Sequence, residues 1–154
     1  MIDKKVNVMQ RRKFIKALLG GVGLALMPIR AMAAMWNTPA FQATQLQAAL
    51  TGLGVNQLTP SKQINIVAPD KAENGAVVQI EIASNIANTE SIAILVDKNP
   101  TALIANFVFT GGADAFVVTR IKMAETSDVQ AVVKVGNQYF TASKRVEVLE
   151  NGCG

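Results

Sequence analysis

From Pro60 onward the chain alternates between apolar and polar residues, and no other feature of the sequence limits the possible folds as strongly. A period of two places every second side chain on the same face, which is typical of a strand with one buried face. Turn-forming sequences separate the apolar runs about every 8 to 14 residues, as in DKNP at 97–100 and GN at 136–137, the latter a two-residue hairpin candidate. The strands predicted in this way cover 64–66, 78–82, 92–96, 103–109, 116–123, 129–135, 139–141 and 146–149.

About seven or eight short strands separated by turns favour an all-β chain, and specifically an immunoglobulin-like antiparallel β-sandwich, over a parallel sheet. The usual Cys…Trp…Cys markers of that fold are missing, because Trp36 and Cys153 lie outside the predicted strands. A partly open barrel fits the same spacing. The length of 154 residues suits a single folded domain.

One short amphipathic helix is expected before the strands. Thr38 is placed to cap its first free N–H groups, and Pro39 at the first helical position loses no hydrogen bond. Apolar residues then recur at roughly helical spacing as far as Leu53. Gly52 and Gly54 are expected to end the helix.

The first 33 residues have the pattern of an export signal. They carry seven of the 15 basic residues and one of the 11 acidic ones, then an apolar run over 17–27 and the small-x-small sequence 31–33. The stretch 10–16 (QRRKFIK) resembles a twin-arginine signal. The alternative is a membrane anchor, but the apolar run is shorter than the roughly 20 residues that span a bilayer. We therefore expect cleavage after residue 33, a periplasmic protein and no stable membrane insertion.

Removing the signal reverses the sign of the net charge. The whole chain has a formal charge of +4, whereas residues 34–154 keep eight basic and ten acidic residues. The largest basic cluster left is Lys144-Arg145, so nucleic-acid binding is not expected. The absence of histidine excludes a Ser-His-Asp triad, a Cys-His pair and a histidine-ligated metal, and the single cysteine excludes an intrachain disulfide. We expect no cofactor.

The only thiol belongs to the penultimate residue, Cys153, between Gly152 and Gly154. Glycine is conformationally permissive, so we expect a flexible arm that holds the sulfur in the open. Three roles are compatible with this position: a structural one, an intermolecular disulfide, and covalent attachment of a cargo. The carboxylates of Glu150 and of the chain terminus disfavour ionisation of the thiol. This favours a cysteine on which other proteins act.

Two further sets of charged residues are each compatible with a structural role and with a role in binding a partner. Asp97 and Lys98 form either a solvated turn or a partner contact. Arg120, Lys122 and Glu125 form either the polar face of a strand or part of a docking surface.

Three stretches carry a resemblance to a known family. These are 95–100 (LVDKNP), 119–127 (TRIKMAETS) and the terminal Gly152-Cys153-Gly154. Together with the twin-arginine signal and the order of helix then strands, they resemble the SoxY family, the sulfur-carrying subunit of the periplasmic thiosulfate-oxidising (Sox) system. The family usually ends Gly-Gly-Cys-Gly-Gly, whereas Asn151 replaces the first glycine here and the chain stops at Gly154. This difference leaves the choice of partner enzymes open.

The resemblance implies a carrier that catalyses none of the steps itself. A SoxZ-like subunit would form a heterodimer with it, and a c-type cytochrome would oxidatively join thiosulfate to Cys153. A hydrolase would then release sulfate, and in some systems a sulfane dehydrogenase would oxidise the remaining sulfur.

The sequence therefore predicts a cleaved signal at 1–33, an N-terminal segment with a short helix at 34–60, a β-sandwich at 61–149 and a flexible carrier arm at 150–154. The alternative is a structural or adhesion-type periplasmic sandwich whose terminal cysteine only forms an intermolecular disulfide. A thiol-disulfide enzyme is disfavoured because a second cysteine is missing.

Overall fold

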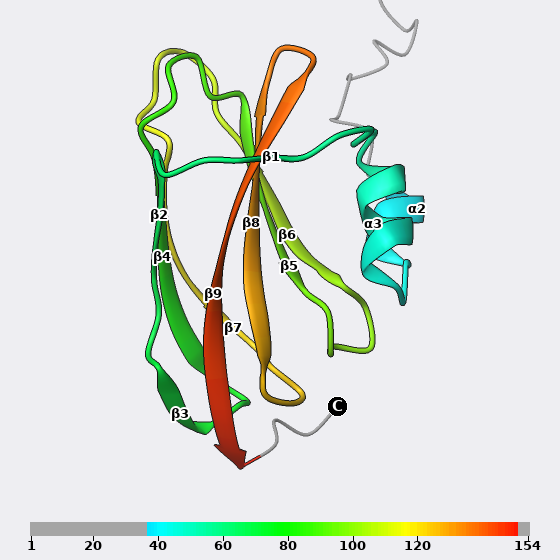
Figure 1. The fold of residues 1–154 in the computed structure, drawn as a ribbon, viewed down its shortest axis with the longest axis vertical. Coiled ribbons are helices and arrows are strands. Elements are labelled where there is room, and N and C mark those ends of the chain that lie inside the picture. Colours follow the sequence, from blue (N-terminus) through cyan, green and yellow to red (C-terminus); the bar gives the residue numbers. More distant parts are fainter. Residues whose placement is uncertain (1–36, 151–154) are drawn as a thin grey trace, which may run out of the picture. The chain divides into compact units, whose positions relative to one another are not determined.

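The computed structural model describes residues 37–150, which form two short helices followed by nine strands (Figure 1). The predicted signal at 1–33 and the tip of the predicted arm at 151–154 lie outside the described residues. The elements are α2 (Thr38–Phe41), α3 (Leu46–Gly52), β1 (Thr59–Pro60), β2 (Ile64–Val67), β3 (Lys71–Asn74), β4 (Val78–Ser84), β5 (Ser91–Val96), β6 (Leu103–Val108), β7 (Phe116–Ile121), β8 (Ser127–Val135) and β9 (Gln138–Glu150).

The strands form two sheets. The larger sheet has six strands in the order β1-β9-β8-β5-β6, with β3 also paired to β9, and the smaller sheet has the order β2-β4-β7. Neighbouring strands are antiparallel except that β1 and β3 run parallel to β9. The predicted all-β, immunoglobulin-like sandwich is confirmed.

The main core lies between the two sheets and is built from the alternating apolar residues. Ile80 and Ile82 of β4, Ile92 and Ile94 of β5, and Val129 of β8 are each at most 1% exposed. Burial of a side chain of this size contributes about 1.5–3 kcal/mol. In β4 the period-two pattern therefore identified both the strand and the face that it buries.

A second apolar cluster lies on the outer face of the six-stranded sheet, where α2 and α3 pack beside β5 and β6 (Figure 1). Ala93 and Leu95 of β5 are buried there together with Leu50 of α3. Both faces of β5 are thus covered, which explains why 92–96 is a continuous apolar run without polar alternation.

The helical region begins at Thr38 as predicted, but the prediction of one continuous helix capped by Thr38 is wrong. Two helices are present, and the cap of the first is Asn37, whose side-chain oxygen accepts a hydrogen bond from the Ala40 amide at 3.2 Å. The helical region is interrupted between them, where the Ala43 carbonyl accepts a hydrogen bond at 3.0 Å from the amide of Ala102, just before β6. At this break the Ala43 carbonyl bonds to a residue next to β6 instead of continuing a helix, and this hydrogen bond connects the helical region to the sheet.

The predicted end of the helical region is confirmed, although its two glycines have different roles. Gly54 has a φ of 78°, its amide donates to Thr51 O at 2.9 Å, and the Val55 amide donates to Leu50 O at 2.9 Å, which is a Schellman motif. Gly52 is instead the contact between the helices, because a Cβ on it would lie 2.8 Å from Ala40 Cα.

The strands predicted at 139–141 and 146–149 are one strand, β9, of 13 residues. It pairs with β8 without interruption from Val135↔Gln138 to Ser127↔Val146. The predicted Gly136-Asn137 turn connects these two strands as a hairpin. The predicted strand at 116–123 ends at Ile121. The short strands β1 and β3 were not predicted, since two and four largely polar residues carry no periodic signal.

The close approach of the two helices makes Gly52 sensitive to any side chain. We expect Gly52→Val to lower the free energy of unfolding by about 2–3 kcal/mol, because overpacking against backbone atoms forces the helices apart. Urea denaturation measures the effect. The matched control is Thr51→Val, at an exposed position of the same helix, where a change within about 0.5 kcal/mol is expected. Equal effects of the two substitutions would contradict this account of the interface.

Candidate functional site

The predicted attachment residue Cys153 and the other predicted arm residues, Asn151, Gly152 and Gly154, lie outside the described residues. The described chain stops at Glu150, the last residue of β9. The part of the candidate site that lies within residues 37–150 is therefore the end of the sandwich at which β9 ends. We call it the exit end, and it consists of the turns at 74–77 and 97–102, the loop at 122–126 and the final residues of β9.

The side chain of Asn99 joins two of these connections. Asn99 is 9% exposed, its Nδ2 donates to Lys122 O at 2.7 Å, and its Oδ1 accepts from the Ala124 amide at 2.8 Å. An amide side chain suits this position because it offers a donor and an acceptor at once. The two separated stretches 95–100 and 119–127 are thereby brought together at the exit end.

The last residues of β9 are held by a further set of hydrogen bonds. Thr126 Oγ1 accepts from the Val148 amide at 2.9 Å, and Glu150 O accepts from the Gly75 amide at 2.9 Å. On its other edge β9 pairs with β3 as far as Asn74↔Glu150. β9 therefore stays hydrogen-bonded to its neighbours up to its final residue, Glu150. Cys153 follows three residues later in the sequence. Three extended residues span about 10 Å.

Ion pairs link side chains of β9 to neighbouring segments. Lys71 Nζ and Glu147 Oε2 are 3.1 Å apart, and Arg145 NH1 and Asp128 Oδ1 are 3.5 Å apart. Lys144 is paired with Asp70, and the hydrogen bond from Lys144 holds the pKa of the Asp70 carboxyl below its ordinary value. These side chains are solvent-exposed, so each pair contributes little to stability.

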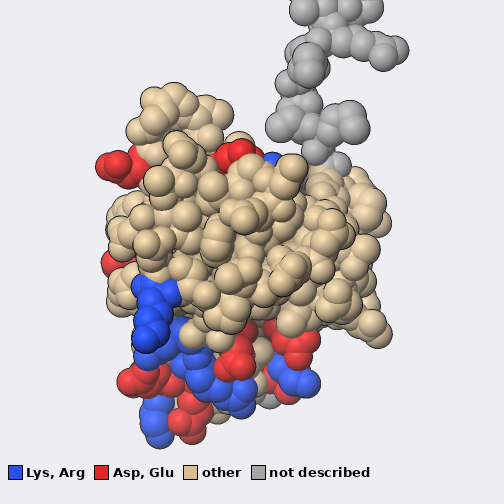
Figure 2. All heavy atoms as spheres, turned by 45° about the horizontal axis from the view of Figure 1, so that its top comes forward, with Lys and Arg blue, Asp and Glu red and all other residues tan. Residues whose placement is uncertain are grey.

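Charged side chains are concentrated near this end of the molecule. Figure 2 shows most of the charged atoms of the displayed face gathered in its lower part, below a surface that is almost free of charge. Basic and acidic groups are interspersed there, so the surface carries no block of one sign. We therefore expect recognition of the exit end to depend on the arrangement of individual charges.

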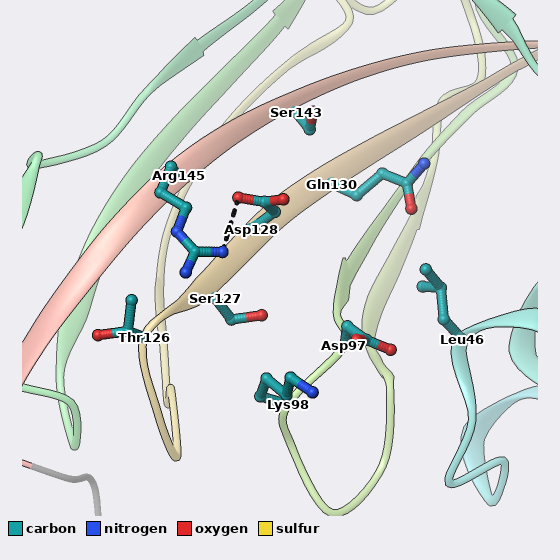
Figure 3. A pocket seen from close by; sticks show the side chains of 9 residues that line it. All are labelled: Leu46, Asp97, Lys98, Thr126, Ser127, Asp128, Gln130, Ser143 and Arg145. Atoms are coloured by element: carbon teal, nitrogen blue, oxygen red, sulfur yellow. Dashed lines mark hydrogen bonds and ion pairs between the residues drawn. The ribbon is translucent and has the colours of Figure 1, made fainter.

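A polar pocket of about 290 Å³ opens beside the exit end on the outer surface of β8 and β9 (Figure 3). Asp97 and Lys98, which the sequence left as a turn or a partner contact, line its lower side. Ser127 is 2% exposed, and its hydroxyl points toward the middle of the ring of lining side chains. The other lining residues are Leu46, Thr126, Asp128, Gln130, Ser143 and Arg145.

Two findings concern only the part of the chain that the structure describes. Among residues 37–150, no group of three or more Asp, Glu, His or Cys side chains is placed to hold a metal ion. No helix within the same range is long and apolar enough to cross a membrane.

Sequence reasoning identified the stretches that meet at the exit end but missed the residues that join them. Asn99 was interpreted only as a turn residue, and Thr126 had no role. Their partners are backbone groups 22 to 25 residues away in sequence. The DKNP sequence marks Asn99 as a turn residue whose side chain tends to bond to local backbone, and it carries no signal for partners 23 and 25 residues away.

Comparison with known proteins gives a consistent result. A family model described as sulfur oxidation protein SoxY matches residues 49–153, a range that ends on Cys153. The sulfur carrier protein SoxY from Chlorobium limicola f thiosulfatophilum is 32% identical, with a TM-score of 0.62, and the match covers 73% of this chain and 99% of that one. No match was found among curated proteins.

A more distant likeness concerns the fold alone. A superoxide reductase (neelaredoxin) from Ignicoccus hospitalis matches with a TM-score of 0.50 and 16% identity, over 56% of this chain and 79% of that one. This level of identity supports a shared β-sandwich without indicating a shared activity.

The hydrogen bonds of Asn99 give a testable expectation for the exit end. Asn99→Ala leaves Lys122 O and the Ala124 amide without their partner in a largely buried position, so we expect a loss of about 2–3 kcal/mol in unfolding free energy. Hydrogen exchange at the Ala124 amide should rise at the same time.

The control is Lys98→Ala, one residue away and exposed, which should leave both measurements within error of the parent protein. If Asn99→Ala is as stable as that control, the exit end is held together by other contacts.

Proposed function

The chain belongs to the SoxY family of sulfur oxidation proteins, and on that premise we propose that it is a sulfur carrier of thiosulfate oxidation. It holds sulfur intermediates covalently on Cys153 and presents them to partner enzymes. The observation that carries this proposal is the family match, which runs to Cys153 and so includes the only thiol in the sequence.

Loading of the carrier is an oxidation. The thiol of Cys153 and the outer sulfur of thiosulfate form a sulfur–sulfur bond, the thiol proton is released, and two electrons pass to an oxidant. A c-type cytochrome partner is the proposed acceptor of these electrons. The product is a cysteine that carries a thiosulfonate group.

Unloading begins with hydrolysis by a second partner. Water supplies the oxygen that converts the terminal sulfonate group to sulfate, one of its protons is released, and the other stays on the persulfide of Cys153. In systems that have a sulfane dehydrogenase, this enzyme oxidises the remaining sulfur while it is still attached.

The sequence supports a passive role for the carrier. It contains no histidine and no second cysteine, and the acidic residue Glu150 lies three positions before Cys153. No nearby group therefore favours the thiolate, and the catalytic groups must come from the partners. A free thiol that reacts only inside a partner's active site is suited to a protein that visits several enzymes.

The geometry of the exit end supports presentation of the cargo. β9 keeps its hydrogen bonds through Val148 and Glu150, and the three residues from Glu150 to Cys153 can span at most about 10 Å. Asn151 and the two glycines next to Cys153 form the proposed flexible arm. A short arm on a rigid strand end lets the sulfur enter a partner while the sandwich stays outside.

We further propose that the protein works in the periplasm after twin-arginine export and removal of residues 1–33. A SoxZ-like subunit is the proposed stable partner in a heterodimer. Asn151 takes the place of the first glycine of the usual tip, so the selection among hydrolase and dehydrogenase partners is the property that this residue is expected to change.

The test is the mass of the C-terminal tryptic peptide, 146–154, from protein purified out of the periplasm of thiosulfate-grown cells. We expect thiosulfonate or persulfide adducts on Cys153, because turnover leaves the carrier partly loaded. Cys153→Ser should abolish thiosulfate oxidation by the cells. Glu150→Gln is the matched control, since it changes the same segment but keeps the thiol, and oxidation should continue.

A bare thiol or a disulfide between protein chains, together with unchanged thiosulfate oxidation in Cys153→Ser, would contradict the carrier role. That combination would support the structural or adhesion-type alternative.

A further inference from the structure

The polar pocket beside the exit end contains a hydroxyl that the fold leaves unused. Ser127 is 2% exposed, and its side chain has no hydrogen-bond partner within residues 37–150. The hydroxyls of buried residues are normally paired, because an unmade hydrogen bond costs free energy. Figure 3 shows this hydroxyl directed into the space between the lining side chains. It is therefore available to a group that enters the pocket.

Two further side chains of β8 keep an oxygen free for the pocket. Gln130 Nε2 donates to Thr141 Oγ1 at 3.0 Å, and Figure 3 shows the remaining amide oxygen on the side of the pocket. Asp128 Oδ1 faces Arg145 NH1 at 3.5 Å, and the second carboxylate oxygen has no partner in the described part of the chain. Amide and carboxylate oxygens are hydrogen-bond acceptors.

The turn after β5 adds one charge of each sign. Asp97 and Lys98 are exposed, and neither belongs to an ion pair among residues 37–150. Arg145, the other basic residue of the lining, already faces Asp128. Together with the oxygens of β8, the Asp97 carboxylate therefore makes the free groups of the pocket mainly acceptors. Such a set fits a cationic group that carries several N–H donors.

The size and the place of the pocket favour a side chain of another protein as its occupant. Its volume of about 290 Å³ lies at the lower limit of small-molecule sites, which is about 300 Å³. Thr126 of the lining accepts a hydrogen bond at 2.9 Å from the Val148 amide, two residues before the end of β9. Since the three residues from Glu150 to Cys153 span at most about 10 Å, an enzyme that reacts with the sulfur must approach the exit end closely.

We propose that this pocket receives a basic side chain, arginine or lysine, of the enzymes that react with the carrier arm. The cation lies between the carboxylates of Asp97 and Asp128. It donates hydrogen bonds to the Ser127 hydroxyl and to the Gln130 amide oxygen. The inference rests on the proposed carrier function and adds to it a contact by which the carrier recognises its enzymes.

The lining suits a transient contact better than a permanent one. Among the described residues that line the pocket, only Leu46 is apolar, whereas obligate interfaces are mainly apolar. Lys98 follows Asp97 in the lining and repels an incoming cation, which weakens the contact. A weak contact between charges lets the carrier leave one enzyme and move to the next.

The test is the initial rate at which thiosulfate is loaded onto Cys153, read from the intact mass of the mature chain. The carrier heterodimer is varied in concentration over a catalytic amount of the purified c-type cytochrome partner, with oxidised cytochrome c as the final electron acceptor. We expect Asp97→Asn to raise the KM for the carrier roughly tenfold and to leave kcat unchanged, because it removes a charge that holds the cation. Lys98→Gln should lower this KM about twofold, because it removes the repelling charge.

Asp114→Asn is the matched control. It removes an exposed negative charge just before β7, and β7 pairs with β4 there at Ala83↔Phe116, at the end of the sandwich opposite Val78↔Ile121. The KM should therefore stay unchanged. The midpoint of urea denaturation should be the same for all three variants.

An unchanged KM in Asp97→Asn, or shifts of the same sign in the two pocket variants, would overturn the proposal. A change in kcat alone would place the arm itself in the pocket, and a weaker heterodimer in sedimentation analysis would place the SoxZ-like subunit there. Either of these results overturns it as well. If Cys153 of the parent protein is never loaded, the carrier function itself fails, and the pocket proposal falls with it.

Discussion

The organisation of this protein depends on one strand that is paired along both of its edges. β9 forms an antiparallel ladder with β8 over its first nine residues and parallel pairs with β1 and β3 on its other edge. β8 in turn pairs with β5, whose two faces carry the two apolar clusters. The central core, the packing of the helices and the position of Glu150 all follow from this arrangement. It places the end of β9 next to the loops at 97–102 and 122–126.

The sequence predicted those parts of the fold that are determined by local pattern. The alternation in 78–82, the apolar run at 92–96 and the Gly136-Asn137 turn defined β4, β5 and the hairpin correctly. In β4 one buried face fixes both the period and the register. The sequence did not predict that β9 is continuous. Residues 141–145 lack large apolar side chains, and the strand continues there because β8 supplies hydrogen-bond partners at every step.

The helix break and the exit end were beyond sequence reasoning for a related reason. The helix break depends on the hydrogen bond from the Ala102 amide to the Ala43 carbonyl. The exit end depends on hydrogen bonds between the Asn99 side chain and backbone groups 23 and 25 residues away in sequence. Contacts between distant segments leave no periodic trace. The predicted attachment residue came instead from the position of the only cysteine and from the family resemblance, and the family match extends over it.

The double-sided pairing of β9 also determines how the molecule responds to a pull. A partner that grips the end of the chain loads β9 along its own axis, so that the ladders with β8 and β3 are strained together in shear. If the strand lay on an open edge and were peeled from its end, its hydrogen bonds would break one after another. A load applied at Glu150 along β9 therefore acts in shear on the pairing with β3, which reaches Glu150, and on the ladder with β8, which ends at Val146.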